Sequence, residues 1–314
     1  MTHPIDIKKH GAEGVVEISG ELPSPNAVRS ANESLTMDSP SPAARPGLLE
    51  RLLKWQNGSV EAEEIAARIL NLPLEFDGFR IAMVSDIHLK SQFLLADEVA
   101  THLSRAKPDL ITILGDAIDG STPSVDPLKE FIRFIASLAP CAAILGNNEY
   151  ASAYLPNLRA AYRDAGIALL EDQSARITRG GAVMRLVGLQ DPWAYVSHLN
   201  VSREPGMPNT EPIRPAAEPN RFDVLMIHRP HRASRYGRQG YALSLAGHAH
   251  GGQWRLPWGQ GIFSPGQGLF PKLTSGLYSL GDGQLVVSRG LGNHEFPIRI
   301  HNRPHLPIVR LIRR

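Results

Sequence analysis

The stretch FRIAMVSDIH, residues 79–88, joins a short apolar run to two residues that can bind a metal ion. Its first seven residues are mostly Ile, Val, Met and Ala, which is typical of a strand covered on both faces. Asp86 and His88 follow at the point where this strand ends. A lone Asp in that position usually caps a helix. Whether Asp86 instead belongs to a metal site depends on which residues follow the other strands.

The same alternation of short apolar runs and helical patterns continues along the chain. Further apolar runs occupy 109–114, 141–145, 182–189, 223–227, 241–246 and 284–288. Helical patterns occur among the early runs, at 92–106, 126–139 and 155–166. Strands that alternate with helices indicate an α/β fold, here with a parallel sheet in its first half.

Polar residues that can ligate metals follow five of these strands. They are Asp86 and His88, then Asp116 and Asp119, then Asn147, then His228, and finally His248 and His250 within GHAHGGQ, residues 247–253. In open α/β sheets the ligand site lies at the carboxyl ends of the strands. Buried polar groups need partners, and metal ions would satisfy this set together.

Composition narrows the class of protein. The chain has 314 residues, a formal net charge of +2 and a single cysteine, Cys141. The charge balance favours neither a nucleic-acid binder nor an acidic partner, and one cysteine excludes a disulfide framework within the chain. Without a run of about 18 apolar residues or a signal-like N-terminus, we expect a cytoplasmic protein.

The chain divides into three parts by composition. Residues 1–46 contain no aromatic side chain and are rich in Ser, Pro and Ala, so we predict a disordered tail. Leucines at helical spacing in GLLERLLKW, residues 47–55, predict an amphipathic helical lead-in over 47–72. That helix would dock on the domain or rest at the inner face of a membrane. The regular α/β domain is predicted over 73–314.

The order D-x-H, G-D-x-x-D, G-N-x-E, H and G-H-x-H resembles that of the calcineurin-like metallophosphoesterase superfamily. The resemblance covers roughly residues 73–314. GHAHGGQ and the closing VSRGLG…FPIR pattern are more similar to a bacterial subgroup that includes exported, membrane-associated members. Membership implies a four-layer α-β-β-α sandwich with a dinuclear site at its strand ends.

The resemblance also assigns the metal ligands. Asp86, His88, Asp116 and His250 would hold one ion, and Asp116 would bridge to a second ion held by Asn147, His228 and His248. Nitrogen and oxygen ligands without sulfur suit two divalent ions such as Mn, Fe, Zn, Co or Ni, and we favour Mn. We therefore predict a phosphoesterase that uses a metal-activated hydroxide.

The third motif departs from the family pattern, G-N-H-D/E, in which the His protonates the leaving group or holds the phosphate. Asn148 occupies the His position, and an amide cannot act as a general acid. A later match, GNHE at 292–295, breaks the motif order, so we do not interpret it as a metal motif. His294 is a candidate substitute proton donor. We expect Asp119 to hydrogen-bond Asn148.

The sequence indicates the substrate less specifically than it indicates the metal ligands. Arg229 could fork onto a phosphate, and Trp254 opens a Gly-, Pro- and aromatic-rich loop over 254–272 that could recognise an apolar group, touch a membrane or pack on itself. Related enzymes cleave the pyrophosphate of UDP-diacylglucosamine, so a lipid-linked nucleotide is one candidate. The alternative is a metal-binding scaffold with little turnover. We expect a phosphate-ester substrate, no nucleic-acid partner, no obligate protein partner, and peripheral membrane contact at most.

Overall fold

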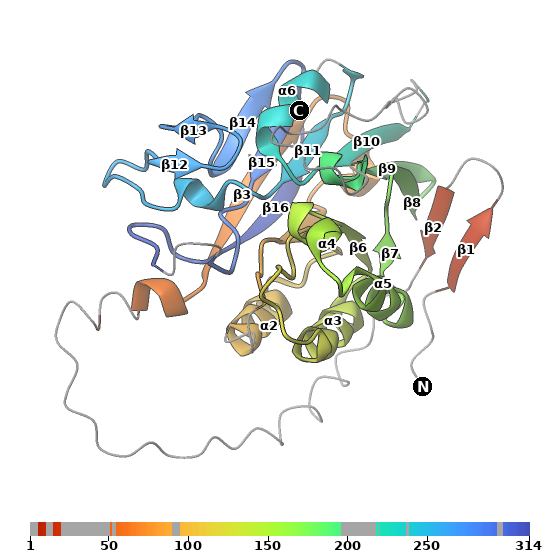
Figure 1. Ribbon diagram of the computed structural model, residues 1–314. Coiled ribbons are helices and arrows are strands. Elements are labelled where there is room, and N and C mark those ends of the chain that lie inside the picture. Colours follow the sequence, from red (N-terminus) through yellow and green to blue (C-terminus); the bar gives the residue numbers. More distant parts are fainter. Residues whose placement is uncertain are drawn as a thin grey trace.

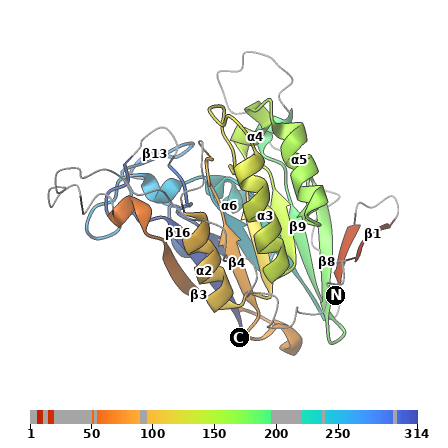
Figure 2. The same ribbon diagram turned by 90° about the horizontal axis from the view of Figure 1, so that it is seen from below.

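The computed structural model describes residues 6–10, 15–19, 51, 55–89, 95–195, 218, 220–236, 239–293 and 298–314. Two β-sheets pack face to face, with several helices on the outer face of one sheet and a short helix on the outer face of the other (Figures 1 and 2). The predicted α/β class and the parallel first half are confirmed.

The six-stranded sheet carries the first part of the site. Its spatial order is β3 (Glu61–Ile69), β16 (His305–Arg313), β4 (Arg80–Val84), β5 (Leu110–Leu114), β6 (Cys141–Ile144) and β7 (Ala168–Leu169). Strands β4 to β7 are mutually parallel, whereas β16 runs antiparallel to β4. The carboxyl ends of β4, β5 and β6 therefore meet at one edge.

The eight-stranded sheet carries the second part of the site. Its spatial order is β1 (Asp6–His10), β2 (Val15–Ser19), β8 (Gln173–Arg179), β9 (Ala182–Gly188), β10 (Arg221–Met226), β11 (Leu243–Ala246), β15 (Gly283–Val287) and β14 (Gly276–Leu280). Strands β9, β10, β11 and β15 are parallel to one another. Their carboxyl ends also point the same way.

Three apolar cores hold the layers together. The first lies between the sheets and includes Met83 and Met184. The second packs the outer face of the six-stranded sheet against α2 (Ala96–Ala106), α3 (Asp126–Leu138) and α5 (Leu155–Asp164). The third lies outside the eight-stranded sheet, where Tyr236 of the short α6 (Ala233–Tyr236) packs against it. Together they give the α-β-β-α layering that the resemblance implied.

The predicted helical lead-in over 47–72 is wrong for residues 61–69, which form the edge strand β3. Ala, Glu and Arg in EAEEIAARI are helix formers, but inward-facing Ile65, Ala67 and Ile69 alternate with more exposed residues, as a strand requires. Pairing with β16 along the whole strand decides the conformation. Residues 55–58 are helical, and 47–50 and 52–54 lie outside the described residues.

Two short strands occur where the composition predicts a disordered tail. Residues 6–10 and 15–19 form β1 and β2, and β2 pairs parallel with β8. Apolar β-branched residues in VVEIS favour this pairing in spite of the polar surroundings. The remainder of the predicted tail lies outside the described residues.

The aromatic-rich segment 254–272 contains a small hairpin of β12 (Phe263–Ser264) and β13 (Gly268–Leu269). Within the described residues, every helix is too short or too polar to cross a lipid bilayer.

Candidate metal centre

Strand ends from both sheets converge on one buried set of polar side chains. Asp86 and His88 follow β4, Asp116 follows β5, and Asn147 opens α4 (Asn147–Ala151) directly after β6. The eight-stranded sheet contributes residues after β10 and β11, namely His228, His248 and His250. Because parallel strands end at the same edge, residues distant in sequence become neighbours.

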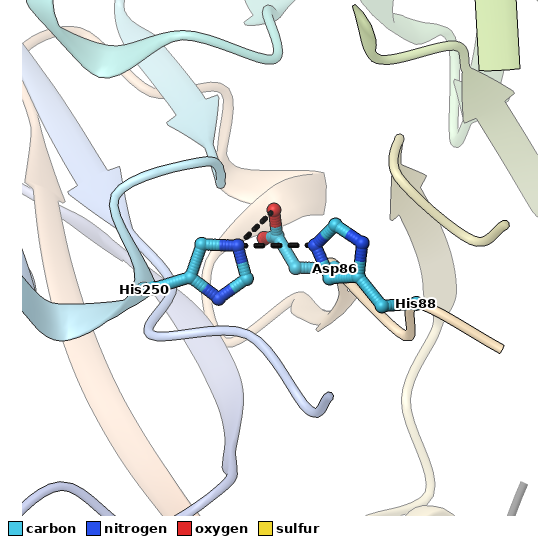
Figure 3. Close-up of side chains that lie close together, drawn as sticks. All are labelled: Asp86, His88 and His250. Atoms are coloured by element: carbon cyan, nitrogen blue, oxygen red, sulfur yellow. Dashed lines mark hydrogen bonds and ion pairs between the residues drawn. The ribbon is translucent and has the colours of Figure 1, made fainter. Parts of the chain in front are cut away.

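The first donor group consists of Asp86, His88 and His250, all buried. The Nε2 atoms of His88 and His250 lie 3.1 Å apart, and His250 Nε2 lies 3.6 Å from Asp86 Oδ1. Figure 3 shows the two rings and the carboxylate facing one another. Ligands about 2.1 Å from a shared ion are separated by about 3–3.5 Å, so these separations suit one cation.

The second donor group consists of Asp116, His228 and His248, and it is equally buried. His228 Nε2 lies 3.2 Å from Asp116 Oδ2 and 3.1 Å from His248 Nδ1. The opposite ring nitrogen of His228 is fixed by the carbonyl oxygen of Leu114 at 2.8 Å. A backbone partner of this kind selects the imidazole nitrogen that faces the ion.

Asp116 lies between the two groups. Its Oδ2 atom is 3.2 Å from His228 Nε2 and 3.9 Å from His88 Nε2, so a single carboxylate faces imidazoles of both groups. This position is suited to a bridging ligand.

The backbone at five of these ligands is in the left-handed region. The φ angles are 51° at Asp86, 45° at His88, 52° at Asp116, 63° at His248 and 47° at His250. Non-glycine residues rarely adopt such angles, and each costs on the order of 1–3 kcal/mol unless the surroundings enforce it. Five such residues in one site indicate that the fold is built to hold these side chains in place.

Glu149 supports the second group through hydrogen bonds to the backbone around Asp116. This fully buried carboxylate accepts hydrogen bonds from the backbone N–H groups of Asp116 at 2.9 Å, Ala117 at 2.5 Å and Gly146 at 2.7 Å. Burial, followed by the charge of Asp116, raises the pKa of Glu149 to about 8. The sequence analysis quoted this residue within G-N-x-E but gave it no role, although the motif was the signal.

Both asparagines of the third motif lie at the second group. Asn147 Oδ1 is buried and makes no hydrogen bond, which suits a metal ligand. Asn148 donates from its backbone to Asp116 Oδ1 at 2.9 Å and from its side chain to Asp116 Oδ2 at 2.7 Å. Asp119 instead accepts hydrogen bonds from Ser121 and lies 3.8 Å from His88 Nδ1, so it supports the first group.

Without a cation, the donors compensate one another's charge. Burial alone lowers the pKa of His228, but the carboxylates of Asp116 and Asp86 outweigh it and raise that pKa to about 10. Burial and the neighbouring Asp116 raise the pKa of Asp86 to about 6. Burial and His228 lower the pKa of His248. Divalent cations would replace the proton that His228 retains and stabilise both carboxylates.

Several observations fit divalent metals at this position. Two groups of three buried ligands occur side by side, and Asn147 Oδ1 and His248 Nε2 are buried without hydrogen-bond partners. Imidazole, carboxylate and amide donors without thiolate are typical of Mn, Fe, Zn, Co or Ni sites.

Comparison with known proteins agrees with this geometry. Residues 79–252 match the family model described as calcineurin-like phosphoesterase. The chain belongs to the calcineurin-like phosphoesterase family. The matched region begins just before β4 and ends directly after His250, so it includes all six residues of the two donor groups.

Relatives in this family are similar to most of the chain. The metallophosphoesterase YkuE of Bacillus subtilis is 28% identical, with 80% of this chain and 85% of YkuE aligned. The phosphodiesterase YaeI of Escherichia coli is 27% identical, over 74% of this chain and 82% of YaeI. The UDP-2,3-diacylglucosamine pyrophosphatase LpxG of Chlamydia trachomatis is 24% identical, over 77% of this chain and 87% of LpxG. As a family member, the chain is a metal-dependent hydrolase of phosphate esters.

The residues predicted to contact substrate or donate a proton differ in where they lie relative to the donor groups. Arg229 is buried beside the second group, where its Nε donates to Asp191 Oδ2 at 2.5 Å. Trp254 follows the turn that contains His248 and His250, and its indole N–H donates to the carbonyl oxygen of Ile298 at 3.1 Å. His294, the candidate proton donor, lies outside the described residues.

The sequence analysis missed the residues that support the first group. Arg299 is fully buried and donates to Asn293 Oδ1 at 2.8 Å and to the carbonyl oxygens of Arg289 and Gly292. Gly292 N–H in turn donates to the Asp86 carbonyl oxygen at 2.6 Å. Asn302 holds the other ligand turn by donating to the His250 carbonyl oxygen at 2.7 Å. Arg289, Gly292 and Arg299 all lie within the VSRGLG…FPIR pattern, which the sequence analysis quoted without giving these residues a role. The contact of Asn302 with His250 joins segments far apart in sequence, so no local motif indicates it.

Proposed function

We propose that the protein hydrolyses a phosphodiester or phosphoanhydride at a dinuclear centre formed by the two donor groups, with Asp116 as the shared ligand. The position of Asp116 Oδ2 between His228 and His88 carries this proposal. Two divalent ions bound there would clamp the phosphoryl group and acidify a water nucleophile. Asn147 Oδ1 would complete the second group.

Asn148 limits which leaving groups the substrate can have. Its amide N–H is too weakly acidic to protonate a leaving group, and its hydrogen bonds to Asp116 make it a positioning residue for the shared ligand. General acid catalysis contributes typically about 10²–10⁴-fold when the leaving group is poor. A chain without that acid favours a leaving group that departs unprotonated, such as the phosphate of an anhydride or an aryl oxide.

A lipid-linked nucleotide pyrophosphate is the substrate class we favour. It contains the phosphoanhydride that Asn148 permits, and LpxG, the pyrophosphatase relative, aligns with 77% of the chain. Arg229, anchored by Asp191 and next to His228, is a proposed phosphate contact. Trp254 is a proposed contact for the remainder of the substrate.

The direct test is hydrolysis of bis-p-nitrophenyl phosphate by Mn²⁺-loaded protein. Asp86→Asn removes a ligand of the first group and serves as the blank. Asp282→Asn makes the same change at an exposed position before β15, at the end of the sheet away from the donors. We expect diester cleavage in the native protein and in Asp282→Asn, and its loss in Asp86→Asn.

The failure of this test is also informative. Protein that binds two metals but cleaves neither the diester nor a lipid-linked pyrophosphate would be the metal-binding scaffold of the alternative hypothesis. Cleavage that persists in Asp86→Asn would remove the first donor group from the mechanism.

A further inference from the structure

An exposed apolar surface lies next to the donor groups. We call it the platform, and it consists of Trp258, Phe263, Leu269, Phe270, Ile298 and Ile300. Trp258 is 76% exposed, Leu269 70% and Phe270 62%. Such fractions are too large for side chains that line a closed pocket, and large exposed apolar groups in one place mark an interaction surface.

The segments that carry the platform are hydrogen-bonded side by side. Arg255 N–H donates to the Ile300 carbonyl oxygen at 2.9 Å, which joins the segment before β16 to the segment after the turn that follows β11. Ile262 N–H donates to the Trp254 carbonyl oxygen, and Phe270 N–H to that of Ile262, each at 2.8 Å. Figures 1 and 2 both place the β12–β13 hairpin on the same side as helical residues 55–58.

The platform also adjoins the metal centre directly. Ile262 N–H donates to the carbonyl oxygen of Gly252, two residues after His250. The hairpin turn packs on the imidazole of His231, since a side chain at Gly266 would overlap that ring. The ring centre of His231 lies 6.3 Å from that of His248. A surface that covered the platform would therefore lie next to the second donor group.

The charges near the platform indicate which kind of partner surface would bind it. Between Asp223 and Asp282 the sequence contains no Asp or Glu but six Arg or Lys residues. One of these, Lys272, is exposed and lies two residues after Phe270 of the platform. Apolar side chains with tryptophan and flanking basic residues are the combination that inserts at the headgroup level of anionic membranes.

We propose that the platform docks the protein on an anionic lipid bilayer, with Trp258, Leu269 and Phe270 inserted at the headgroup level. The metal centre then lies beside the membrane surface. This goes beyond the proposed function, because binding to the bilayer requires no turnover. It also accounts for access to a substrate whose phosphoanhydride is linked to a lipid.

Vesicle sedimentation tests the proposal with the metal-loaded full-length protein. We expect binding to vesicles of phosphatidylcholine mixed with phosphatidylglycerol, and weaker binding to phosphatidylcholine alone and at high salt. The triple variant Trp258→Ser, Leu269→Ser, Phe270→Ser should bind the mixed vesicles about a hundredfold more weakly. Its rate on soluble bis-p-nitrophenyl phosphate should equal that of the native protein, which also shows that the variant is folded.

A matched control uses exposed leucines elsewhere. Leu70 and Leu74 are 63% and 68% exposed and follow β3, whose direction places them at the end opposite Asp86. The double variant Leu70→Ser, Leu74→Ser should bind vesicles as the native protein does. Asp116→Asn should also bind vesicles normally, so a failure of catalysis is distinguishable from a failure of docking.

Three outcomes would overturn the proposal. The first is that the native protein does not bind the mixed vesicles. The second is that the triple variant binds them as well as the native protein does. The third is a native dimer in sedimentation velocity that the triple variant loses, because the platform would then be the interface with a second copy of the chain.

Discussion

The two donor groups have similar compositions but are held by different parts of the molecule. The second group is supported from the ends of β5 and β6 in the six-stranded sheet, because Glu149 gathers the backbone N–H groups around Asp116 and the Leu114 carbonyl oxygen fixes His228. The first group depends on the C-terminal segment, where Arg299 and Asn302 hold the loops that carry its ligands.

This difference means that the two groups can be disrupted separately. Damage near β6 should reach the second group first, and damage to the C-terminal segment that holds the loops of Asp86 and His250 should reach the first. Asp116 is the exception because it faces both groups. The predictions below test this division, beginning with the residue that the groups share.

Asp116→Ala should have the largest effect. Removal of the shared carboxylate leaves His88 and His228 without their common partner, so both ions should be lost. We expect diester hydrolysis to fall by at least about 10³-fold, and metal analysis after gel filtration to show less than one ion per chain. Full activity in this variant would contradict the assignment of Asp116, and Asp282→Ala provides the control.

A matched pair of glycine variants should separate the groups. A methyl group at Gly247 would overlap Ser85 Oγ and Asp86 Oδ2, whereas one at Gly146 would overlap Asp116 Oδ1 and press on His228. Gly247→Ala should therefore weaken the first group more than the second, which it reaches only through His248, and Gly146→Ala should lose both ions. Displacements of about 1 Å cost roughly a hundredfold in rate. Identical metal contents in the two variants would show that the groups are not independently supported.

Asn148→His should change substrate preference. The new imidazole would stand where the amide now contacts Asp116 and could protonate a leaving oxygen. We expect hydrolysis of an alkyl phosphodiester to rise by about tenfold or more, with less than about a threefold change for bis-p-nitrophenyl phosphate. A plot of rate against leaving-group pKa measures this, and an unchanged slope would exclude proton donation from this position.

His305, which packs against the segment of Arg289 that supports the first group, should make the stability of the fold sensitive to acid. Its Nδ1 accepts a hydrogen bond from Arg289 N–H and its Nε2 faces Glu63 at 2.9 Å, and burial lowers its pKa to about 4. The unfolded chain, with a pKa near 6.5, binds the proton more readily. Stability should therefore decline as the pH falls from about 6.5 to 4, by up to about 3 kcal/mol.

Denaturant unfolding of metal-free protein across this pH range checks the prediction. His305→Gln should flatten the decline, whereas the same change at exposed His301 should leave it in place. An equally steep decline in His305→Gln would assign the acid sensitivity to other groups.

The sequence predicted the part of the site that depends on strand topology. Asp86, Asp116 and His228 each follow an uninterrupted apolar run, and parallel strands bring such ends together whatever the details of packing. The seven strands that these runs predicted all form, as do the three helices.

The sequence did not predict features that depend on contacts across the fold. Strand β3 has a helix-forming composition and becomes a strand only because β16, more than 200 residues later, pairs with it. Arg299 and Asn302 act on loops whose positions are known only after the two sheets have packed. The left-handed backbone at His248 and His250 also depends on packing, because non-glycine residues adopt it only where their surroundings enforce it.

The central claim is that the two donor groups bind two divalent ions with one shared carboxylate. Isothermal titration of metal-free protein with Mn²⁺ tests it most directly, with His250→Ala and Asp116→Ala measured alongside. We predict two ions per chain in the native protein, one in His250→Ala and fewer than one in Asp116→Ala. A single ion per native chain, unaffected by His250→Ala, would contradict a dinuclear centre.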